Sequence, residues 1–180
     1  MCIRDRAWAM NGEALRPEQG YPARLVVPGW EGNMWVKWIR RLEFGDKPYM
    51  TREETSKYTD LLTDGKARMF TWVMEAKSVV TSPSPEKPIL HKGIQQLRGL
   101  AWSGKGKIKR VDVSVDGGKN WRTAQLHAPI MSKSLVRFTL PFEWSGEELL
   151  IQSRAIDETG YVQPYIQELQ KIRGKNSIYH

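Results

Sequence analysis

Two basic residues, Arg24 and Lys37, lie near the two ends of a segment at 20–38 with the sequence GYPARLVVPGWEGNMWVKW. Between them, a run of apolar β-forming residues at 25–27 ends in Pro-Gly, a pair typical of a turn. A guanidinium can bind two oxygens of a phosphate or carboxylate at once, and an ammonium supplies a point charge. The segment therefore either holds an anionic group or forms an ordinary strand–turn–strand whose cations face water.

The composition is that of a folded globular protein. Of the 180 residues, 40% are hydrophobic and 27% are charged, a balance that differs from that of disordered chains. No apolar run approaches the roughly 18–20 residues of a membrane span. The single cysteine, Cys2, excludes an internal disulfide and a CxxC metal or redox site.

The net charge of +8 favours anionic partners, which include nucleic acid, an acidic protein and a small oxyanion. The basic residues form short clusters at 40–41, 105–110 and 171–175, and each cluster alone is equally consistent with a solvated surface. Their scatter, together with the acidic DVSVDGG stretch, argues against a nucleic-acid-binding domain.

The chain from residue 76 to 179 has the pattern of a β domain. Apolar and polar residues alternate at 110–116, and Asp-Gly-Gly-Lys at 116–119 predicts a tight hairpin turn. Further strands are predicted at 136–142 and 149–156. Short strands at about ten-residue spacing predict an immunoglobulin-like sandwich.

The first 65 residues do not form a complete domain by the same reasoning. Thr51 and Glu54 make a capping-box pattern that predicts a short helix, and the proline-rich stretch 81–88 is typical of a connection. A domain boundary is therefore expected near 65–70. Four tryptophans occur between Trp8 and Trp38, and the segment offers little surface of its own to cover them. We expect it to be the end of a larger domain.

Two long segments resemble the sulfite oxidase family of molybdenum enzymes. Residues 7–44, AWAMNGEALRPEQGYPARLVVPGWEGNMWVKWIRRLEF, are similar to the closing segment of its molybdopterin domain. Residues 99–121, GLAWSGKGKIKRVDVSVDGGKNW, are similar to its C-terminal dimerisation domain. The stretches PEQGYP and TREETSKYTDLL look more like the sulfane dehydrogenase molybdenum subunits of bacterial Sox sulfur oxidation than the vertebrate or plant enzymes.

The resemblance implies a mainly β fold in two parts. Residues 7–66 would be the C-terminal part of an α+β molybdopterin-binding domain. Residues 67–180 would be an immunoglobulin-like dimerisation domain that lacks its last strand, because NSIYH stops where relatives continue.

The resemblance also implies which residues contact the molybdenum–molybdopterin cofactor. By motif position these are Gln19, Arg24, Trp35, Val36 and Lys37. Trp35 and Gln19 stand where vertebrate enzymes have histidines. Only a backbone role therefore carries over to Trp35, and Gln19 can donate or accept a hydrogen bond without carrying charge.

Two further residues correspond to the family's substrate site. Tyr58 in SKYTD aligns with its active-site tyrosine, and a phenol can donate a hydrogen bond to an oxyanion at neutral pH. Arg173 in KIRGK matches the arginine of the NLRG motif, which reaches the anion pocket from the dimerisation domain. A sulfite-like oxyanion needs such a guanidinium once it leaves water.

The activity implied for the full-length protein is oxidation of sulfite, or of sulfane sulfur on a carrier protein, by oxygen-atom transfer at molybdenum. Electrons would pass to a c-type cytochrome in the periplasm, and the sandwich would form a homodimer. The family's metal-ligating cysteine is expected upstream, because Cys2 lies in MCIRDR, which does not resemble the family. We therefore expect an inactive fragment. The alternative is a non-catalytic immunoglobulin-like module for dimerisation or interaction.

Overall fold

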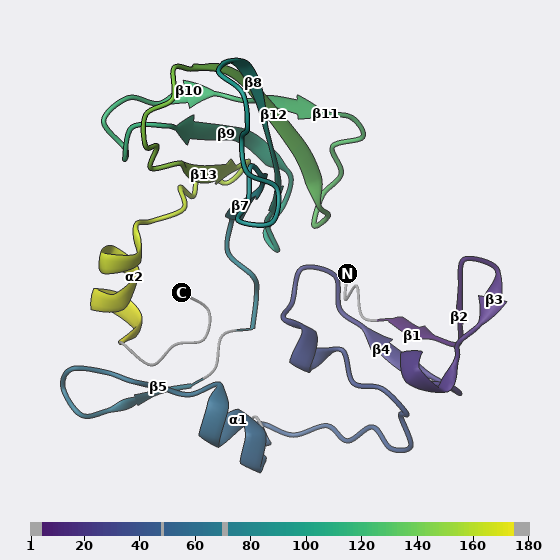
Figure 1. Cartoon of the computed structure of the whole chain (residues 1–180). Coiled ribbons are helices and arrows are strands. Elements are labelled where there is room, and N and C mark those ends of the chain that lie inside the picture. The colour runs from purple at the N-terminus through teal and green to yellow at the C-terminus, as the bar shows by residue number, and fades with distance from the viewer. Residues whose placement is uncertain (1–4, 48, 70–71, 175–180) are drawn as a thin grey trace. The chain divides into compact units, whose positions relative to one another are not determined.

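A computed structural model describes residues 5–47, 49–69 and 72–174, and the contacts divide the chain into two compact units (Figure 1). Unit 1 is the chain up to Val73 together with the residues from Pro164 onward, and unit 2 is Met74–Gln163. Cys2 and the NSIYH end at 176–180 lie outside the described residues.

The strands of unit 1 are short and pair antiparallel. The pairs are β1 (Asp5–Ala7) with β4 (Arg24–Val26), β2 (Ala9–Met10) with β3 (Glu13–Ala14), and β5 (Asp60–Leu61) with β6 (Ala67–Arg68). The helical elements are the 3₁₀ turns η1 (Pro17–Gln19) and η2 (Gly32–Met34), and the α-helices α1 (Arg52–Lys57) and α2 (Ile166–Arg173).

The short helix predicted after Thr51 is confirmed as α1. Thr51 is its N-cap residue, but its side chain makes no capping hydrogen bond to the described residues, and the side chain of Glu54 lies outside them. The helix ends before Tyr58. Helix α2 is absent from the sequence predictions, and its buried residues, Leu169 and Arg173, are four positions apart on one face.

Many large apolar side chains of unit 1 are exposed. Phe44 is 100% exposed, and Trp8 and Trp38 are also largely accessible. Trp30, in contrast, packs edge-to-face on Trp72, with ring centroids 5.1 Å apart. Unit 1 thus covers only part of its own apolar surface. Among the described residues, no helix is both long and apolar enough to cross a membrane.

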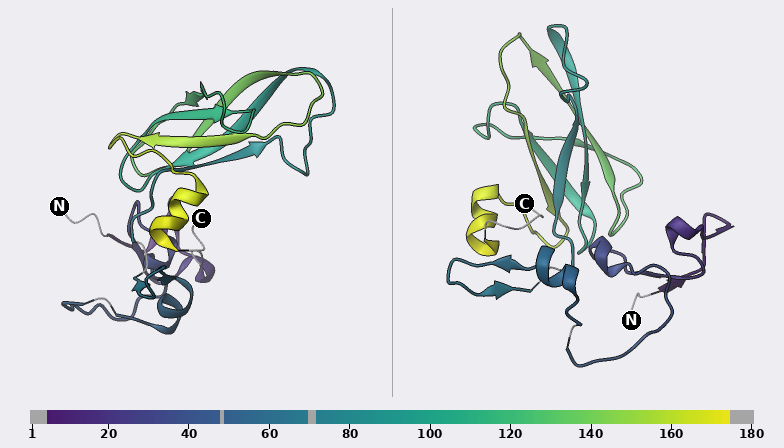
Figure 2. Two further views of the ribbon diagram at one scale, coloured as in Figure 1. Left: turned by 90° about the vertical axis from the view of Figure 1, so that its left-hand side faces the viewer. Right: turned by 60° about the horizontal axis from the view of Figure 1, so that its bottom comes forward.

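Unit 2 consists of two antiparallel sheets, so the fold is mainly β, as predicted (Figures 1 and 2). One sheet has the order β11-β12-β8-β7 and the other has the order β10-β9-β13. The strands are β7 (Lys77–Ser82), β8 (Gly93–Trp102), β9 (Ile108–Ser114), β10 (Arg122–Thr123), β11 (Gln125–His127), β12 (Val136–Trp144) and β13 (Gln152–Asp157).

The core of unit 2 lies between the two sheets. Val111 and Val113 of β9 contribute to the same buried cluster as Leu97 of β8 and Phe138 of β12. The predicted alternation of buried and exposed residues is confirmed for β12. In β9, Val111 and Val113 face the core as predicted, but the intervening Asp112 and the following Ser114 are buried as well, so the strand is not half-buried. The sheets form a β-sandwich, while its immunoglobulin-like character stays a prediction.

A fully buried carboxylate anchors the turn after β13. Asp157 is 0% exposed and accepts hydrogen bonds from the Ser103 hydroxyl at 2.7 Å and from both the amide and the hydroxyl of Thr159. The Tyr161 amide donates a further bond. Burial alone would raise the pKa of Asp157, but these hydrogen bonds favour the charged form and hold its pKa below the ordinary value.

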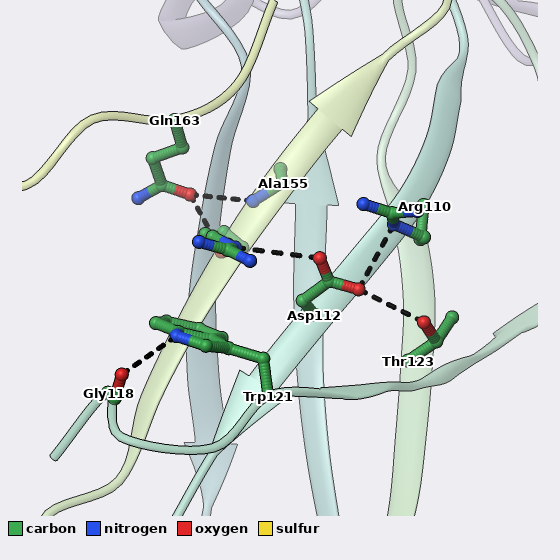
Figure 3. A network of polar contacts seen from close by, with 9 residues as sticks. Arg110, Asp112, Gly118, Trp121, Thr123, Ala155 and Gln163 are labelled. Carbon is green, nitrogen blue, oxygen red and sulfur yellow. Dashed lines mark hydrogen bonds and ion pairs between the residues drawn. The ribbon is translucent and has the colours of Figure 1, made fainter.

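The outer face of the three-stranded sheet carries a polar network that joins its strands (Figure 3). Asp112 of β9 forms ion pairs with Arg110 at 3.1 Å and Arg154 of β13 at 3.5 Å, and it accepts a hydrogen bond from Thr123 of β10. The Arg154 guanidinium lies 4.1 Å from the centroid of the Trp121 ring. One carboxylate thereby connects all three strands.

Asp116 organises the predicted hairpin that follows β9. Its carboxylate accepts hydrogen bonds from the backbone amides of Asn120 and Lys119, at 2.9 and 3.0 Å. The Ser114 hydroxyl and the Asn120 side chain also donate to it. These bonds, led by that of the Asn120 amide, hold the pKa of Asp116 well below its ordinary value.

Replacing Asp116 with asparagine should lower the urea midpoint of unfolding at pH 7. The neutral side chain of asparagine accepts hydrogen bonds from these donors less strongly than the charged carboxylate does. The native pKa is below that of an unfolded aspartate, about 3.9, so the stabilisation is complete above that value and is lost as the pH falls. The difference between wild type and variant should therefore shrink from pH 7 to pH 3. A difference that stays constant would contradict this account.

Candidate functional site

The structure brings the two cations of the segment 20–38 to one turn. The Arg24 guanidinium donates to the Gln19 carbonyl oxygen, with 3.0 Å between Nη1 and O. The Lys37 ammonium donates to the neighbouring carbonyl of Glu18. Both side chains therefore meet at η1, although they are far apart in the sequence.

Gly20 makes this convergence possible. It follows η1 with φ +112°, in the region that favours glycine. A Cβ atom at this position would lie 3.0 Å from Cβ of Lys37 and 3.2 Å from Cβ of Arg24. A side chain at residue 20 would therefore be strained by the positive φ and would crowd both cationic side chains.

Hydrogen bonds between two distant stretches fix the base of the segment. The Leu25 amide donates to the Val36 carbonyl at 2.8 Å, and the Ile39 amide donates to the Ala23 carbonyl at 3.0 Å. The Arg24 guanidinium also donates to the Trp35 carbonyl at 3.3 Å and lies 5.8 Å from that ring. The backbone carbonyls of Trp35 and Val36 thus join the strand around Arg24, while the backbone contact of Trp35 with the cofactor stays a prediction.

The five residues predicted to contact the cofactor therefore lie in one cluster. Gln19 contributes its carbonyl to Arg24, while its side-chain oxygen accepts a hydrogen bond from the Arg16 amide at 3.0 Å. Trp38, which closes the segment, is exposed, and its indole donates to the Pro17 carbonyl at 2.8 Å.

Asn33 is a candidate that sequence reasoning missed. Both polar atoms of its side-chain amide are buried without a hydrogen-bond partner among the residues that the structure describes. The same holds for Nε of Arg24. Buried polar atoms are almost always satisfied, so we expect a buried water molecule or a bound group to pair with these atoms. In the sequence, the pair Gly32-Asn33 is typical of a turn, and this pattern does not indicate that the Asn33 side chain is buried.

The two predicted substrate residues lie in the same compact unit. Tyr58 is half-buried at the C-terminal end of α1, two residues before β5. Arg173 ends α2 and is only 3% exposed. A guanidinium is rarely buried this deeply unless it is paired with an anion or other acceptors. In the range described, no three His, Cys, Asp or Glu side chains lie together as a possible metal site.

Comparison with known proteins places the chain in a family. Residues 68–180, more than half of the chain, match the model of the Mo-co oxidoreductase dimerisation domain. The chain belongs to the molybdenum cofactor oxidoreductase family. Residues 6–53 match the oxidoreductase molybdopterin binding domain, and the cofactor of this family is molybdenum–molybdopterin. The predicted relationship to the sulfite oxidase family is thereby confirmed.

Individual members of the molybdenum cofactor oxidoreductase family show how much of a relative the chain spans. It is 34% identical to sulfite oxidase of Gallus gallus over 172 residues, which is 88% of this chain and 37% of that protein. It is 32% identical to nitrate reductase [NADH] 2 of Nicotiana tabacum, covering 88% of this chain and 20% of that protein.

A solved structure gives a further comparison. The sulfane dehydrogenase SoxCD from Paracoccus pantotrophus is 63% identical in sequence, with a TM-score of 0.90. The match covers 98% of this chain and 46% of that one. The chain thus spans less than half the length of each of these three relatives.

The residues around η1 fit the cofactor of the family. Molybdopterin carries a phosphate and a polar ring system, so it requires cations and hydrogen-bonding groups. Arg24 and Lys37 supply the cations, and Nε of Arg24 is a buried polar atom without a hydrogen-bond partner among the described residues. The chemistry of this cluster therefore matches that of the absent group.

Proposed function

We propose that the protein to which this chain belongs is a molybdenum-dependent oxidoreductase that oxidises sulfite or a sulfane sulfur held on a carrier protein. The convergence of Arg24 and Lys37 on one turn carries the proposal, because it joins the residues of the cofactor motif in space. The similarity to a sulfane dehydrogenase and to a sulfite oxidase supports the choice of sulfur substrates.

The cofactor cluster would hold molybdenum–molybdopterin through Arg24, Lys37, Gln19 and the backbone of 35–36. When bound, the cofactor supplies the redox centre at which an oxygen atom is transferred to sulfur. The guanidinium of Arg24 is held by two backbone carbonyls, so its orientation is set before any ligand arrives. Such preorganisation reduces the entropy lost on binding.

Arg173 and Tyr58 would bind the substrate. The guanidinium of Arg173 would pair with the oxygens of a sulfite-like anion, and the Tyr58 hydroxyl would donate a hydrogen bond to the same group. Both residues come from unit 1, which also contains the cofactor cluster. Placing them on one compact unit supports a shared site.

Domain organisation and partners complete the proposal. We assign 7–66 to the molybdopterin-binding domain and 67–180 to the dimerisation domain, through which two copies would pair. The chain passes from unit 1 to unit 2 after Val73 and returns to unit 1 at Pro164, so that helix α2 belongs to unit 1.

A c-type cytochrome would accept the electrons, a sulfur carrier would deliver a sulfane substrate, and the enzyme would act in the periplasm.

The test uses the full-length gene that contains this sequence, expressed in a host that makes molybdopterin. Molybdenum content is measured first, followed by cytochrome c reduction with sulfite or with a persulfidated carrier protein. Stoichiometric molybdenum and reduction with sulfite would support a sulfite dehydrogenase. Turnover of the carrier alone would assign sulfane sulfur as the substrate. A protein that binds no molybdenum would overturn the proposal.

The exposed lysines Lys105, Lys107 and Lys109 should steer an acidic electron acceptor to the protein. Replacing all three with alanine should slow cytochrome reduction about tenfold at low ionic strength, because electrostatic attraction raises association rates. The salt dependence should also become weaker. Lys87, Lys92 and Lys119, which are also exposed on unit 2, provide the matched triple-alanine control. An unchanged salt dependence in the triple variant would exclude this role.

A further inference from the structure

We propose that Gly174 is a positioning residue, which sets the depth and direction of Arg173 by allowing α2 to end directly against the backbone of β5. The inference rests on the proposed function, since it concerns the arginine assigned to substrate binding. It adds a residue whose role is geometric and which carries no functional group of its own.

The backbone conformation of Gly174 is one that residues with side chains avoid. Its φ is +85° and its ψ is 178°, a combination that is almost restricted to glycine. Its amide donates to the Gln170 carbonyl at 2.8 Å and so closes the last turn of α2. The chain therefore turns sharply immediately after Arg173.

The backbone of β5 lies so close to Gly174 that no side chain fits between them. A Cβ atom at Gly174 would lie 2.1 Å from the carbonyl oxygen of Leu61 and 3.1 Å from its carbonyl carbon. Real Cβ atoms essentially never come within 3.0 Å of such a neighbour. Because the obstacle is backbone, rotation of a flexible side chain cannot relieve the overlap. Figure 2 shows α2 beside the β5–β6 hairpin.

This close approach joins the two segments that carry the proposed substrate residues. Leu61 follows Tyr58 by three positions, and Gly174 is bonded to Arg173. Consecutive Cα atoms are about 3.8 Å apart, so a shift of Gly174 away from Leu61 must also move the backbone of Arg173. The glycine thus fixes the arginine relative to the strand that follows the tyrosine.

Burial along α2 shows that the helix has little freedom to adjust. Leu169 and Arg173 are both buried on one face, at 9% and 3% exposure. A side chain at 174 would push the end of the helix outward while Leu169 holds the preceding turn. The expected result is a tilt that withdraws the guanidinium from its site.

The test compares three variants of the full-length, cofactor-loaded protein with wild type. Gly174→Ala introduces the overlap with Leu61, and Arg173→Met removes the guanidinium itself. Gly65→Ala is the matched control, because Gly65 has φ +82° in the same unit and a Cβ there would meet none of the described atoms within 4 Å. It places a side chain at a positive φ without the collision.

Two readouts separate positioning from general stability. We expect Gly174→Ala to raise KM for the substrate about tenfold with a smaller change in kcat, because sub-ångström misplacement of a binding group weakens its contact. Sulfate binding, measured by calorimetry without turnover, should weaken by a similar factor. Molybdenum content should equal that of wild type, and Gly65→Ala should leave KM and sulfate affinity unchanged.

The outcomes distinguish this inference from the proposed function. If Arg173→Met retains wild-type KM and sulfate affinity, the proposed role of Arg173 is wrong. If Arg173→Met is impaired while Gly174→Ala behaves like Gly65→Ala, the positioning role alone is wrong. If Gly174→Ala does not fold, hydrogen exchange of the wild-type protein provides the test. Sulfate should protect the backbone amides at 60–62 and at 172–174 together from exchange. If sulfate protects neither group of amides, the inference is wrong.

Discussion

Replacing Arg173 with methionine should lower kcat/KM for sulfite about 100-fold while leaving the molybdenum content unchanged. Methionine fills much of the volume of the arginine stem but cannot pair with an anion. A hydrogen-bonded charge pair of this kind contributes up to about 3 kcal/mol, which corresponds to roughly two powers of ten in rate. Steady-state kinetics with metal analysis on the same preparation provides the measurement.

A lysine at position 173 is the informative companion. It restores the charge without the planar fork of donors, so its activity should lie between those of wild type and the methionine variant. A methionine variant with wild-type kcat/KM would show that the buried guanidinium has a structural role only. Loss of molybdenum in either variant would instead indicate that Arg173 supports the cofactor cluster.

Replacing Asp157 with alanine should lower the free energy of unfolding of the sandwich by about 3–5 kcal/mol. The carboxylate is fully buried and receives four hydrogen bonds, so its removal leaves several buried donors without an acceptor. Each unsatisfied donor costs about 1–3 kcal/mol, and the costs are only partly additive. Urea unfolding followed by circular dichroism measures the change.

Asparagine at 157 and alanine at the exposed Glu86 provide the controls. The asparagine keeps the shape and one acceptor, so it should destabilise the sandwich less than alanine does, and the Glu86 variant should change little. The native pKa of Asp157 is lowered, so its ionised form contributes fully above the unfolded value of about 3.9 and progressively less below it. A wild type whose stability does not decline below pH 4 would contradict this assignment.

The sandwich strands could be predicted from the sequence because their signal is local. Residues such as Val111 and Val113 alternate with polar neighbours, and a period of two defines the buried face whichever strand lies alongside. The antiparallel return around 116–119 could be predicted in the same way, since Gly117 and Gly118 adopt the positive φ that the Asp-Gly-Gly sequence indicates. The connection from Ser114 to Arg122 is longer than the tight turn predicted.

The site could be predicted only in part. The molybdopterin-domain motif identifies Arg24 and Lys37 as candidates. Their side chains contact the neighbouring carbonyls of Gln19 and Glu18 because a turn brings these distant residues together, and the motif does not predict that turn. The buried amide of Asn33 left no trace in the sequence beyond that of a turn. Burial of a particular side chain depends on tertiary packing, which local patterns do not contain.

Helix α2 was missed for a related reason. Ile166, Leu169 and Ile172 have helical spacing, but eight residues give only two turns of such a pattern. The structure also buries a different set from the one that this spacing indicates, because Ile166 and Ile172 are exposed whereas Arg173 is buried beside Leu169. The burial of Arg173 reverses the usual relation between charge and exposure.

The chain order of the two units has a consequence for biosynthesis. The sandwich is contiguous, so it can fold as soon as residue 163 has left the ribosome, whereas unit 1 must wait for residues synthesised after the sandwich. The segment that carries Arg173 is thus among the last to join the unit translated first. A premature stop just after residue 163 would leave unit 2 attached to a unit 1 that lacks α2 and Arg173.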